Sequence, residues 1–416
     1  MSRAAAASKR PWYKMKRVWF LIIIALCIAA LNACSSTRVL MQTADNKPSA
    51  KRTAAPAIDV STFDTAAVKQ ALQTEVYGPI PSLGTVTISD RRVINESVLN
   101  GLATLEELTL TVAPDFGDGP QSEDSFIMVL LSPNDADGPV PVIMMETFCP
   151  NHDTIPLPGI TKPTGDYFSC DGDGMMSSVF GFFFGRYITT PPIEDILGRG
   201  YALATTYSSS YVPDRASTAL PLLRGRYNNA RAIGMWAYQF SAMSHALKSD
   251  VRFNKTVAYG HSRYGKSALF AAAFDDTIDG VIAHQSGTGG ASLSKGKPGE
   301  TVAQITEGYP HWFTASYTED TLTIDQHHLL ALIAPRPILL GNARRDVWSD
   351  PEGAFLAAKA ATPVYKAKGG KGLSATKLGD FKPADSIAYW IRPGTHGVVK
   401  EDWPGFLAFM DAHFGD

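Results

Sequence analysis

The sequence predicts an α/β domain in which a mostly parallel sheet is covered by helices on both faces, giving three layers. Short runs of apolar and β-branched residues recur along the chain, and longer stretches with helical periodicity lie between several of them. Strands that alternate with helices form parallel βαβ units, whose sheet is buried on both faces. The 416 residues, 45% of them hydrophobic, supply enough material for a large core.

The expected elements follow one another in a regular order. The strand-like runs are LEELTLTVA, FIMVLLS, PVIMMETF, YALATTY, KTVAYG, GVIAHQS, PILLGN and IAYWIR. The helix-like stretches are 228–247, 266–274, 351–361 and 403–414. Turns rather than helices separate the first strands, so we expect the sheet to begin with antiparallel pairs.

The first 33 residues have the pattern of an export signal. A basic cluster precedes an apolar run from Val18 to Leu31, which is shorter than the roughly 20 residues needed to cross a bilayer. The sequence from Leu31 to Cys34 resembles the bacterial lipoprotein signal, in which the Cys is lipidated and becomes the new N-terminus. Asn32 is unusual within that box, so a secretory peptide without a lipid or an uncleaved anchor is the alternative.

The chain is therefore divided into a signal peptide over 1–33, a flexible tether over 34–58 and one catalytic domain over 59–416. Residues after Cys34 are rich in Ser, Thr, Ala, Pro and Lys without apolar periodicity, which is typical of a tether. Ser35 and Ser36 favour sorting to the outer membrane, so we expect an exported envelope lipoprotein, with a secreted or periplasmic protein as the alternative. The lipid would make the membrane a partner.

Removal of residues 1–33 leaves 32 basic and 40 acidic side chains, a net charge of about −8. No run of Lys or Arg remains, so we expect no nucleic-acid partner. We expect no metal and no cofactor, because His327 and His328 are adjacent and point in different directions and no HExxH motif occurs. We take the protein to act as a monomer.

Two cysteines remain once Cys27 in the signal and Cys34 at the lipid site are set aside. Cys149 and Cys170 could form a disulfide in an oxidising compartment, worth about 2–4 kcal/mol. Two buried thiols are the alternative, and the sequence alone leaves the choice open.

Residues 260–266, GHSRYGK, suggest a nucleophilic serine. Ser262 follows the strand-like run KTVAYG and precedes a helix-like run, which is where catalytic groups lie in a parallel sheet. A tight turn there exposes the serine Oγ, and the N–H of the next residue faces an oxyanion. The second glycine is displaced by one position from the usual Gly-x-Ser-x-Gly pattern, so a turn without chemistry is the alternative on spacing alone.

A serine nucleophile needs a base, which follows it in the order serine, acid, histidine. The candidates after Ser262 are His284, His311, His327, His328, His396 and His413. His396 stands in the loop PGTHG directly after the last strand, which is where such a fold delivers its base. The acid should follow the preceding strand, PILLGN, where Asp346 and Asp350 compete and spacing does not choose between them.

GHSRYGK resembles the Gly-x-Ser-Arg-x-Gly-Lys signature of the glucuronoyl esterases, carbohydrate esterase family fifteen, of the bacterial type. Further matches in the same order are TFCPNHDTIP, GYALATTY, SGTGGASLS, GETV, PHWF, DQHHLLALIAPRP, DVWSDP and a late DW. They extend from about residue 77 to the C-terminus. The resemblance implies the α/β-hydrolase fold and hydrolysis of esters between glucuronate, often 4-O-methylated and carried on xylan, and lignin alcohols.

The resemblance also implies roles for individual residues. Ser262 is the nucleophile, His396 the base, and Arg263 helps to stabilise the oxyanion. Lys266, Glu300 and Trp348 correspond to side chains that hold the sugar hydroxyls or methoxy group. A surface charge or a core Trp is the bland alternative for each of these three.

One departure concerns the triad acid. Many members carry a Glu just before the Ser-Gly of the glycine-rich loop, but this sequence has Gln285 there, which cannot stabilise an imidazolium by charge. Other members carry the acid in an Asp-x-Trp arrangement, which Asp346 and Trp348 match. We therefore expect Asp346 to be the acid and count Gln285, a polar neighbour, among the substrate-binding residues.

The leading prediction is a serine-type esterase with an acyl-enzyme intermediate. An acetylxylan or general carbohydrate esterase of the same fold is the runner-up, and Lys266 and Glu300 would matter little to it. A non-catalytic carbohydrate-binding lipoprotein is the third possibility, which Gln285 favours and the intact Ser262, Arg263 and His396 argue against.

Overall fold

The computed structural model describes residues 19–24, 27, 55–117, 123–164, 167, 170 and 184–415. The chain divides into two compact units, residues 1–46 and 47–416. Of the first unit, residues 19–24 form a short helical segment with exposed apolar side chains. Most of the expected signal peptide, and Cys34 with its lipidation, lie outside the described residues. No helix among those described has the length and apolar character needed to span a membrane.

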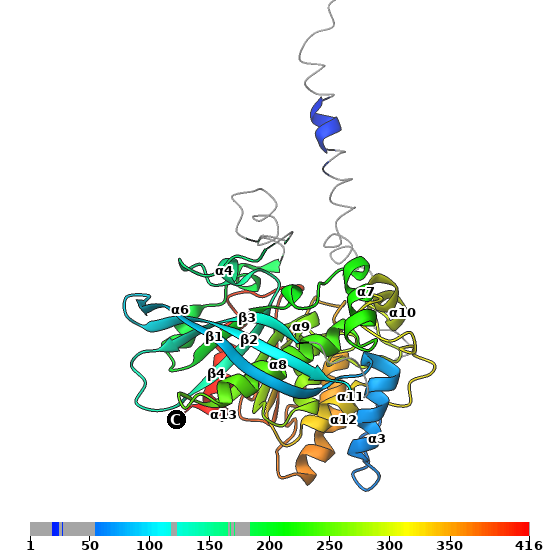
Figure 1. Ribbon diagram of the computed structural model, residues 1–416. Helices are drawn as coiled ribbons and strands as arrows, with labels where there is room; N and C mark the ends of the chain where they lie inside the picture. Colours follow the sequence, from blue (N-terminus) through cyan, green and yellow to red (C-terminus); the bar gives the residue numbers. More distant parts are fainter. Residues whose placement is uncertain are drawn as a thin grey trace, which may run out of the picture. The chain divides into compact units, whose positions relative to one another are not determined.

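The second unit is built on one sheet (Figure 1). Within the described residues its strands are β1 Ser82–Val98, β2 Ala103–Asp115, β3 Asp124–Pro133, β4 Val140–Thr147, β5 Ala202–Tyr207, β6 Phe253–His261, β7 Gly280–His284, β8 Ile338–Ala343 and β9 Ile387–Arg392. Their order across the sheet is β1-β2-β3-β5-β4-β6-β7-β8-β9. β1, β2, β3 and β5 pair antiparallel in that succession, and all pairings from β5 through β4 to β9 are parallel. The expected antiparallel beginning and mostly parallel sheet are confirmed.

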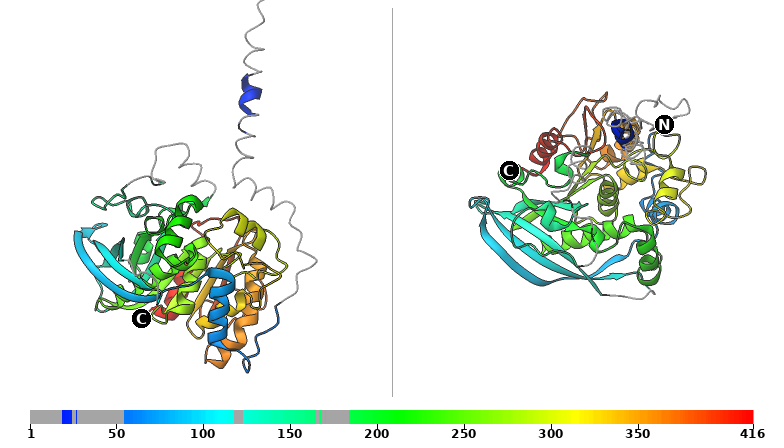
Figure 2. Two further views of the ribbon diagram at one scale, coloured as in Figure 1. Left: turned by 45° about the vertical axis from the view of Figure 1, so that its right-hand side comes forward. Right: turned by 90° about the horizontal axis from the view of Figure 1, so that it is seen from above.

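Helices precede or connect most of the parallel strands. The α-helices are α3 Thr65–Ala71, α4 Asn151–Thr154, α6 Ile193–Leu197, α7 Ala216–Arg226, α8 Ala232–Lys248, α9 Arg263–Phe274, α10 Val302–Gly308, α11 Gln326–Ile333, α12 Pro351–Ala367 and α13 Trp403–Phe414. Shorter turns of other helical types are η1 Leu72–Tyr77, η2 Arg186–Ile188 and η3 Ser208–Ser210. Helix α3 lies beside α11, far from it in sequence, as both views of the chain show (Figures 1 and 2).

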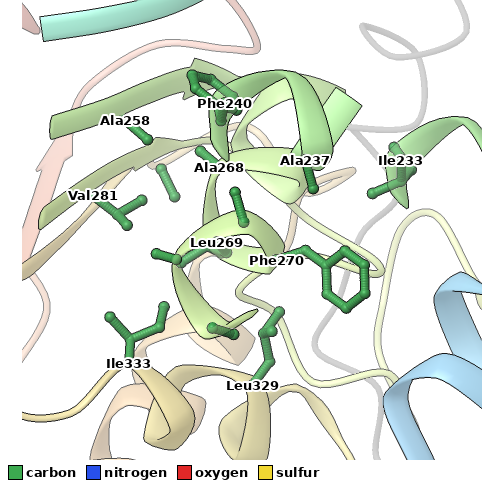
Figure 3. Packing of buried hydrophobic residues seen from close by; sticks show 14 of the residues in the cluster. Ile233, Ala237, Phe240, Ala258, Ala268, Leu269, Phe270, Val281, Leu329 and Ile333 are labelled. Atoms are coloured by element: carbon green, nitrogen blue, oxygen red, sulfur yellow. The ribbon is translucent and has the colours of Figure 1, made fainter. Parts of the chain in front are cut away.

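Successive residues of the inner strands alternate between two hydrophobic layers. On β7, Val281 and Ala283 belong to one core, and Ile282 between them belongs to the other. The larger core lies against α8, α9, α11 and α12, and Figure 3 shows side chains of α8, α9 and α11 meeting those of β6 and β7. The smaller core lies against α6 and α13. Alternation with a period of two thus gives the three layers of the α/β-hydrolase fold.

Two elements differ from the sequence-based expectation. Strand β1 was not predicted, because most of its 17 residues are exposed and polar and it pairs only with β2. Helix α11, which contains His327 and His328, was also missing from the expected helices; Asp325 caps it. The packed region also begins before the expected start at residue 59: Ile58 is buried, and its N–H donates to the Ala360 carbonyl oxygen at 3.0 Å.

The structure joins Cys149 and Cys170 in a disulfide across 21 positions of sequence. The bond ties the residues that follow β4 to Cys170, whose N–H donates to Oδ2 of Asp153 at 2.7 Å. Of the two alternatives that the sequence left open, the disulfide is the one observed.

Candidate active site

Polar side chains gather at the carboxyl ends of four adjacent parallel strands, β6 to β9. Ser262 follows β6, Gln285 follows β7, Asp346 lies in the loop after β8, and His396 lies in the loop after β9. Ligands of open parallel sheets bind at this edge. The chain order of serine, acid and histidine therefore becomes an order in space across the sheet.

Ser262 occupies a sharp turn between β6 and α9. Its backbone has φ 57° and ψ −121°, a conformation that costs a non-glycine residue about 1–3 kcal/mol and persists only where the surroundings enforce it. Its N–H donates to the His284 carbonyl oxygen at 2.8 Å, and its own carbonyl accepts from the Gly265 N–H at 3.0 Å. Ser262 is partly exposed, as a nucleophile at such an elbow must be.

The two flanking glycines make this turn possible. A Cβ on Gly260 would lie 1.9 Å from the Tyr264 carbonyl oxygen, and one on Gly265 would lie 2.9 Å from the Gly260 carbonyl oxygen. Both positions therefore exclude side chains because the strand and the helix pass too close to each other. The displaced second glycine serves the same purpose as the one in the usual pattern.

The partly exposed His396 and the buried Asp346 form a hydrogen-bonded pair beside this elbow. Nδ1 of His396 lies 2.8 Å from Oδ2 of Asp346, which is 0% exposed. Burial alone would raise the pKa of Asp346. The charge and hydrogen bond of His396, together with two hydrogen bonds from Ser349, outweigh burial and hold this pKa below its usual value. The His396 ring centroid is 4.6 Å from that of His261, the residue before Ser262.

Asp350, the other candidate for the acid, caps a helix. It caps α12 with φ 58°, and its Oδ1 accepts from the Gly353 N–H at 3.1 Å. An N-cap carboxylate satisfies a helix donor that has no partner within the helix. Of the two candidates, Asp346 is the one in contact with His396, and Asp350 is engaged as a helix cap.

Gln285 holds the loop that carries the base. Its Nε2 donates to the Thr395 carbonyl oxygen at 3.2 Å, and its Oε1 accepts from the Gly397 N–H at 2.9 Å. The side chain thus bonds on both sides of His396 and is only 1% exposed. We therefore assign Gln285 to positioning the base rather than to the substrate contact expected from the sequence.

Arg392 holds the same loop from the other side. Its guanidinium donates to the Gly397 carbonyl oxygen at 2.7 Å and to the Pro393 carbonyl oxygen at 3.0 Å. Its Nε lies 2.8 Å from Oδ1 of Asp402, and both side chains are buried. Sequence reasoning missed Arg392, although Asp402 lies in the late DW motif.

Two buried histidines lie beneath the base. Nδ1 of His261 is 3.2 Å from Nδ1 of His284, and Nε2 of His284 is 3.4 Å from Oδ1 of Asp402. Burial is the main cause that lowers the pKa of both imidazoles, so they are neutral near pH 7. His396 can therefore become the cation of this group during catalysis without a charged histidine beside it.

The other candidate histidines have contacts of their own. Nε2 of His311 is 2.9 Å from Asp214, and Nε2 of His413 is 3.1 Å from the Asp385 carbonyl oxygen. Among the described residues, no group of three or more His, Cys, Asp or Glu side chains is placed to hold a metal ion.

Lys266 lies in the first turn of α9 and is 3% exposed. Its Nζ donates to the carbonyl oxygens of Ser286 at 2.5 Å and Thr288 at 2.7 Å, which holds the glycine-rich loop to the elbow. Burial lowers the pKa of Lys266 to about 7, although the charge of Glu300 opposes this shift. An amino group has three positions for hydrogen bonds, and these two contacts occupy two of them.

Glu300 and Trp348 contact each other through their backbones. The Glu300 N–H donates to the Trp348 carbonyl oxygen at 3.4 Å, and the Glu300 side chain is nearly buried. Trp348 is partly exposed. A Cβ on Gly299 would lie 2.1 Å from the Val347 carbonyl oxygen, so the two segments pass each other at this glycine. Lys266, Glu300 and Trp348 therefore lie around the glycine-rich loop.

The site contains the parts needed for acyl transfer. The elbow presents a hydroxyl, and the hydrogen bond to Asp346 orients the His396 imidazole. Arg263 is the first residue of helix α9, where the first backbone N–H groups have no partner within the helix. Such an N–H group can stabilise the oxyanion of a tetrahedral intermediate.

Comparison with known proteins shows the family of this chain. The chain is 33% identical over 370 residues to carbohydrate esterase MZ0003 from an unknown prokaryotic organism, with 83% of each chain covered. The chain belongs to the glucuronoyl esterase family. A model of that family described as "Glucuronyl esterase, fungi" matches residues 222–369. A 4-O-methyl-glucuronoyl methylesterase from Wolfiporia cocos is 33% identical over 257 residues, which cover 51% of this chain and 62% of the fungal one.

Solved structures give the same result for the whole fold. A glucuronoyl esterase from Solibacter usitatus is 30% identical with a TM-score of 0.71, covering 85% of this chain and 93% of its own. An esterase of the family from a marine bacterial metagenome, described as promiscuous, is 28% identical with a TM-score of 0.70, covering 87% and 97%. As a glucuronoyl esterase family member, the protein is a carboxylic ester hydrolase.

Sequence reasoning missed a further set of residues at the site, which are Asp214, Arg392 and Ser349. Ser349 Oγ lies 3.2 Å from Nδ1 of His396 and donates to the Gln285 carbonyl oxygen at 3.1 Å. Ser349 contacts His396, and Arg392 contacts the loop that carries it. Such contacts leave no periodic pattern in the sequence, so they could not be predicted from it. Only Ser349 lies in a motif that the resemblance had already marked, DVWSDP.

Proposed function

We propose that the protein hydrolyses esters of glucuronic acid through an acyl-enzyme formed on Ser262. The observation that carries the proposal is the hydrogen bond between the buried Asp346 and His396, beside a strained serine elbow. In this mechanism Ser262 Oγ attacks the ester carbonyl while His396 Nε2 takes its proton. His396 then returns the proton to the leaving alcohol, and water releases the acid by the reverse roles.

The charge that develops on the carbonyl oxygen is met by Arg263. Arg263 is the residue directly after Ser262, and its backbone N–H lies at the start of α9. A uronate ester is neutral until the tetrahedral oxyanion forms, so a cation there acts more strongly on the transition state than on the substrate. This arrangement supports rate acceleration rather than tight substrate binding.

The proposed substrate class rests on the relatives and on the side chains of Lys266, Glu300 and Trp348. Several relatives are 4-O-methyl-glucuronoyl methylesterases. We propose that Lys266 and Glu300 bond to the sugar hydroxyls and that Trp348 packs against the ring or its methoxy group. The natural ester would then join the glucuronate of glucuronoxylan to an alcohol of lignin, and no cofactor enters the reaction.

A broader ester specificity is the second candidate. The marine relative is described as promiscuous and matches nearly its whole length. Acetylated xylan would then be turned over at a comparable rate, with little dependence on Lys266 or Glu300.

Steady-state hydrolysis of the benzyl and methyl esters of glucuronic acid tests these proposals, using residues 55–416. We expect turnover that Ser262→Ala abolishes, and that Lys266→Met and Glu300→Gln reduce mainly through KM. Turnover of acetylated xylan but not of glucuronate esters would favour the second candidate. Retention of carbohydrate without release of alcohol, unchanged by Ser262→Ala, would favour a binding protein.

We also propose that the enzyme is exported, anchored by a lipid on Cys34 and active as a monomer at the bacterial cell envelope, in the outer membrane. The sequence around Cys34 supports this proposal. Metabolic labelling with a palmitate analogue, with Cys34→Ser as the control, tests the anchor. Label that persists in Cys34→Ser would contradict it.

A further inference from the structure

We propose that Asp214 is a positioning residue that aims the Arg263 guanidinium and cancels its net charge, so that the anionic product is released readily. The inference rests on the proposed function, in which Arg263 stabilises the oxyanion. Asp214 lies between η3 and α7, far from Arg263 in sequence, and no motif points to it.

The Arg263 side chain is held in one place. Nη1 of Arg263 forms an ion pair with Oδ2 of Asp214. The guanidinium carbon lies 4.7 Å from the ring centroid of Trp312, 5.3 Å from that of Phe148 and 5.7 Å from that of Tyr309. Aromatic faces attract a guanidinium and limit its motion. The orientation of Arg263 is therefore set before a substrate arrives.

Asp214 is itself fixed by two neutral donors. Its Oδ1 accepts from Nε1 of Trp312 at 2.7 Å and lies 2.9 Å from Nε2 of His311. Burial is the larger cause that lowers the pKa of His311 to about 4, and Arg263 adds to it. His311 is therefore neutral at pH 7 and donates from Nε2. The only cation that these contacts bring to Asp214 is Arg263, so the two charges cancel locally.

Cancellation affects the ester and its product differently. The ester carries no net charge at its carboxyl carbon, so the net charge of Arg263 contributes little to its binding. The free uronate carries one negative charge at that same carbon, and an unpaired guanidinium would attract it through a partly desolvated site. Asp214 removes much of that attraction, while the guanidinium N–H groups not bonded to Asp214 remain as short-range hydrogen-bond donors for the oxyanion.

The test measures two ligands that differ only in charge, glucuronate and its uncharged amide, on protein that cannot turn over. We would titrate both calorimetrically into Ser262→Ala and into Ser262→Ala with Asp214→Asn, at about pH 8.5, where Lys266 is mostly neutral. In the Asp214→Asn protein we expect glucuronate to bind at least about tenfold tighter relative to the amide. A unit charge about 4 Å away is worth about a thousandfold in affinity at an effective dielectric constant of about 20, and solvent at this partly exposed site reduces that gain. With Ser262 restored, we expect Asp214→Asn to lower kcat more than it raises KM.

Two controls separate this role from general support of the fold. Asp214→Glu keeps the charge and should keep the wild-type preference between acid and amide. Asp214→Asn combined with Arg263→Gln should show no gain in glucuronate binding, because the unpaired cation is gone. An unchanged acid-to-amide ratio in Asp214→Asn, or the same gain without Arg263, would overturn the proposal.

If Asp214→Asn does not fold, the Ser262→Ala protein alone still decides. A neutral pair predicts acid and amide affinities within about threefold, whereas an uncompensated guanidinium predicts a preference for the acid of about tenfold or more. The latter result would overturn the proposal. Failure to bind either ligand would instead contradict the proposed glucuronate specificity, and the proposed role of Asp214 would be rejected together with it.

Discussion

Asp346 reaches Nδ1 of His396 at 2.8 Å from the loop after β8, while the position after β7 is occupied by Gln285. The charge that stabilises the imidazolium therefore comes from one strand, and the support of the base loop comes from its neighbour. The two tasks are carried by different residues, which makes them separable by mutation.

Replacement of the acid should nearly abolish turnover. Asp346→Asn removes the charge opposite His396 and allows the wrong imidazole tautomer, so we expect kcat to fall by about 10³–10⁴. Asp350→Asn is the matched control four residues away, and should cost at most about 1 kcal/mol of stability, because Asn also caps helices, without this loss of kcat. Equal losses of kcat in both variants would show that Asp346 is not the specific partner of His396.

Gln285→Glu should reduce activity, although it introduces the acid that many family members carry. A carboxylate can still accept from the Gly397 N–H, but it cannot donate to the Thr395 carbonyl oxygen that it would face at about 3.2 Å. We expect a loss of about 1–3 kcal/mol in the free energy of unfolding and a lower kcat. Urea unfolding and steady-state kinetics measure the two effects. A faster enzyme would mean that Glu at this position serves as a second acid.

Gly260→Ala should prevent formation of the elbow. The new Cβ would meet the Tyr264 carbonyl oxygen at 1.9 Å, so strand and helix must separate. We expect loss of activity together with a large drop in melting temperature. Gly225→Ala provides the comparison, since nothing lies within 4 Å of its Cβ in α7 and Ala favours a helix by about 1 kcal/mol. If Gly260→Ala retained full activity, the close approach would not be a requirement of the turn.

The buried Lys266 should make stability depend on pH. Its pKa falls from 10.5 to about 7 on folding, so between these values the unfolded chain binds a proton that the folded chain has released. The free energy of unfolding should therefore rise with pH in this window for this residue. Lys266→Met removes the dependence, so the wild type should gain relative to Lys266→Met between pH 7 and pH 10 in urea unfolding. The exposed Lys359→Met should show no such trend, and a trend of opposite sign for Lys266 would contradict the neutral buried amine.

The disulfide should contribute measurably to stability. Cys149→Ser with Cys170→Ser opens a loop of 21 positions, for which the chain-entropy model gives about 3 kcal/mol. Dithiothreitol should lower the melting temperature of the wild type towards that of the double variant and leave the double variant unchanged. A reductant effect of equal size on both proteins would mean that the bond contributes nothing.

The strands of the inner sheet could be predicted from sequence because burial on both faces leaves continuous apolar runs. β1 could not, because an exposed strand with one partner carries a polar sequence that resembles a loop. The order of Ser262, Asp346 and His396 could be read from their positions after successive strands, with the family resemblance favouring Asp346 over Asp350. The roles of Gln285 and Asp214 could not, because each depends on which atoms of a distant loop lie within hydrogen-bonding distance.

The loop that carries His396 is held by Gln285 and by Arg392 with its partner Asp402. During synthesis the ribosome delivers the elbow, the glycine-rich loop and the acid well before Arg392, the base and Asp402. A nascent chain that already contains Ser262 in its folded surroundings lacks the imidazole that would activate it. Such a chain remains chemically silent, so esterase activity begins only once Arg392, the base and Asp402 have folded into the site.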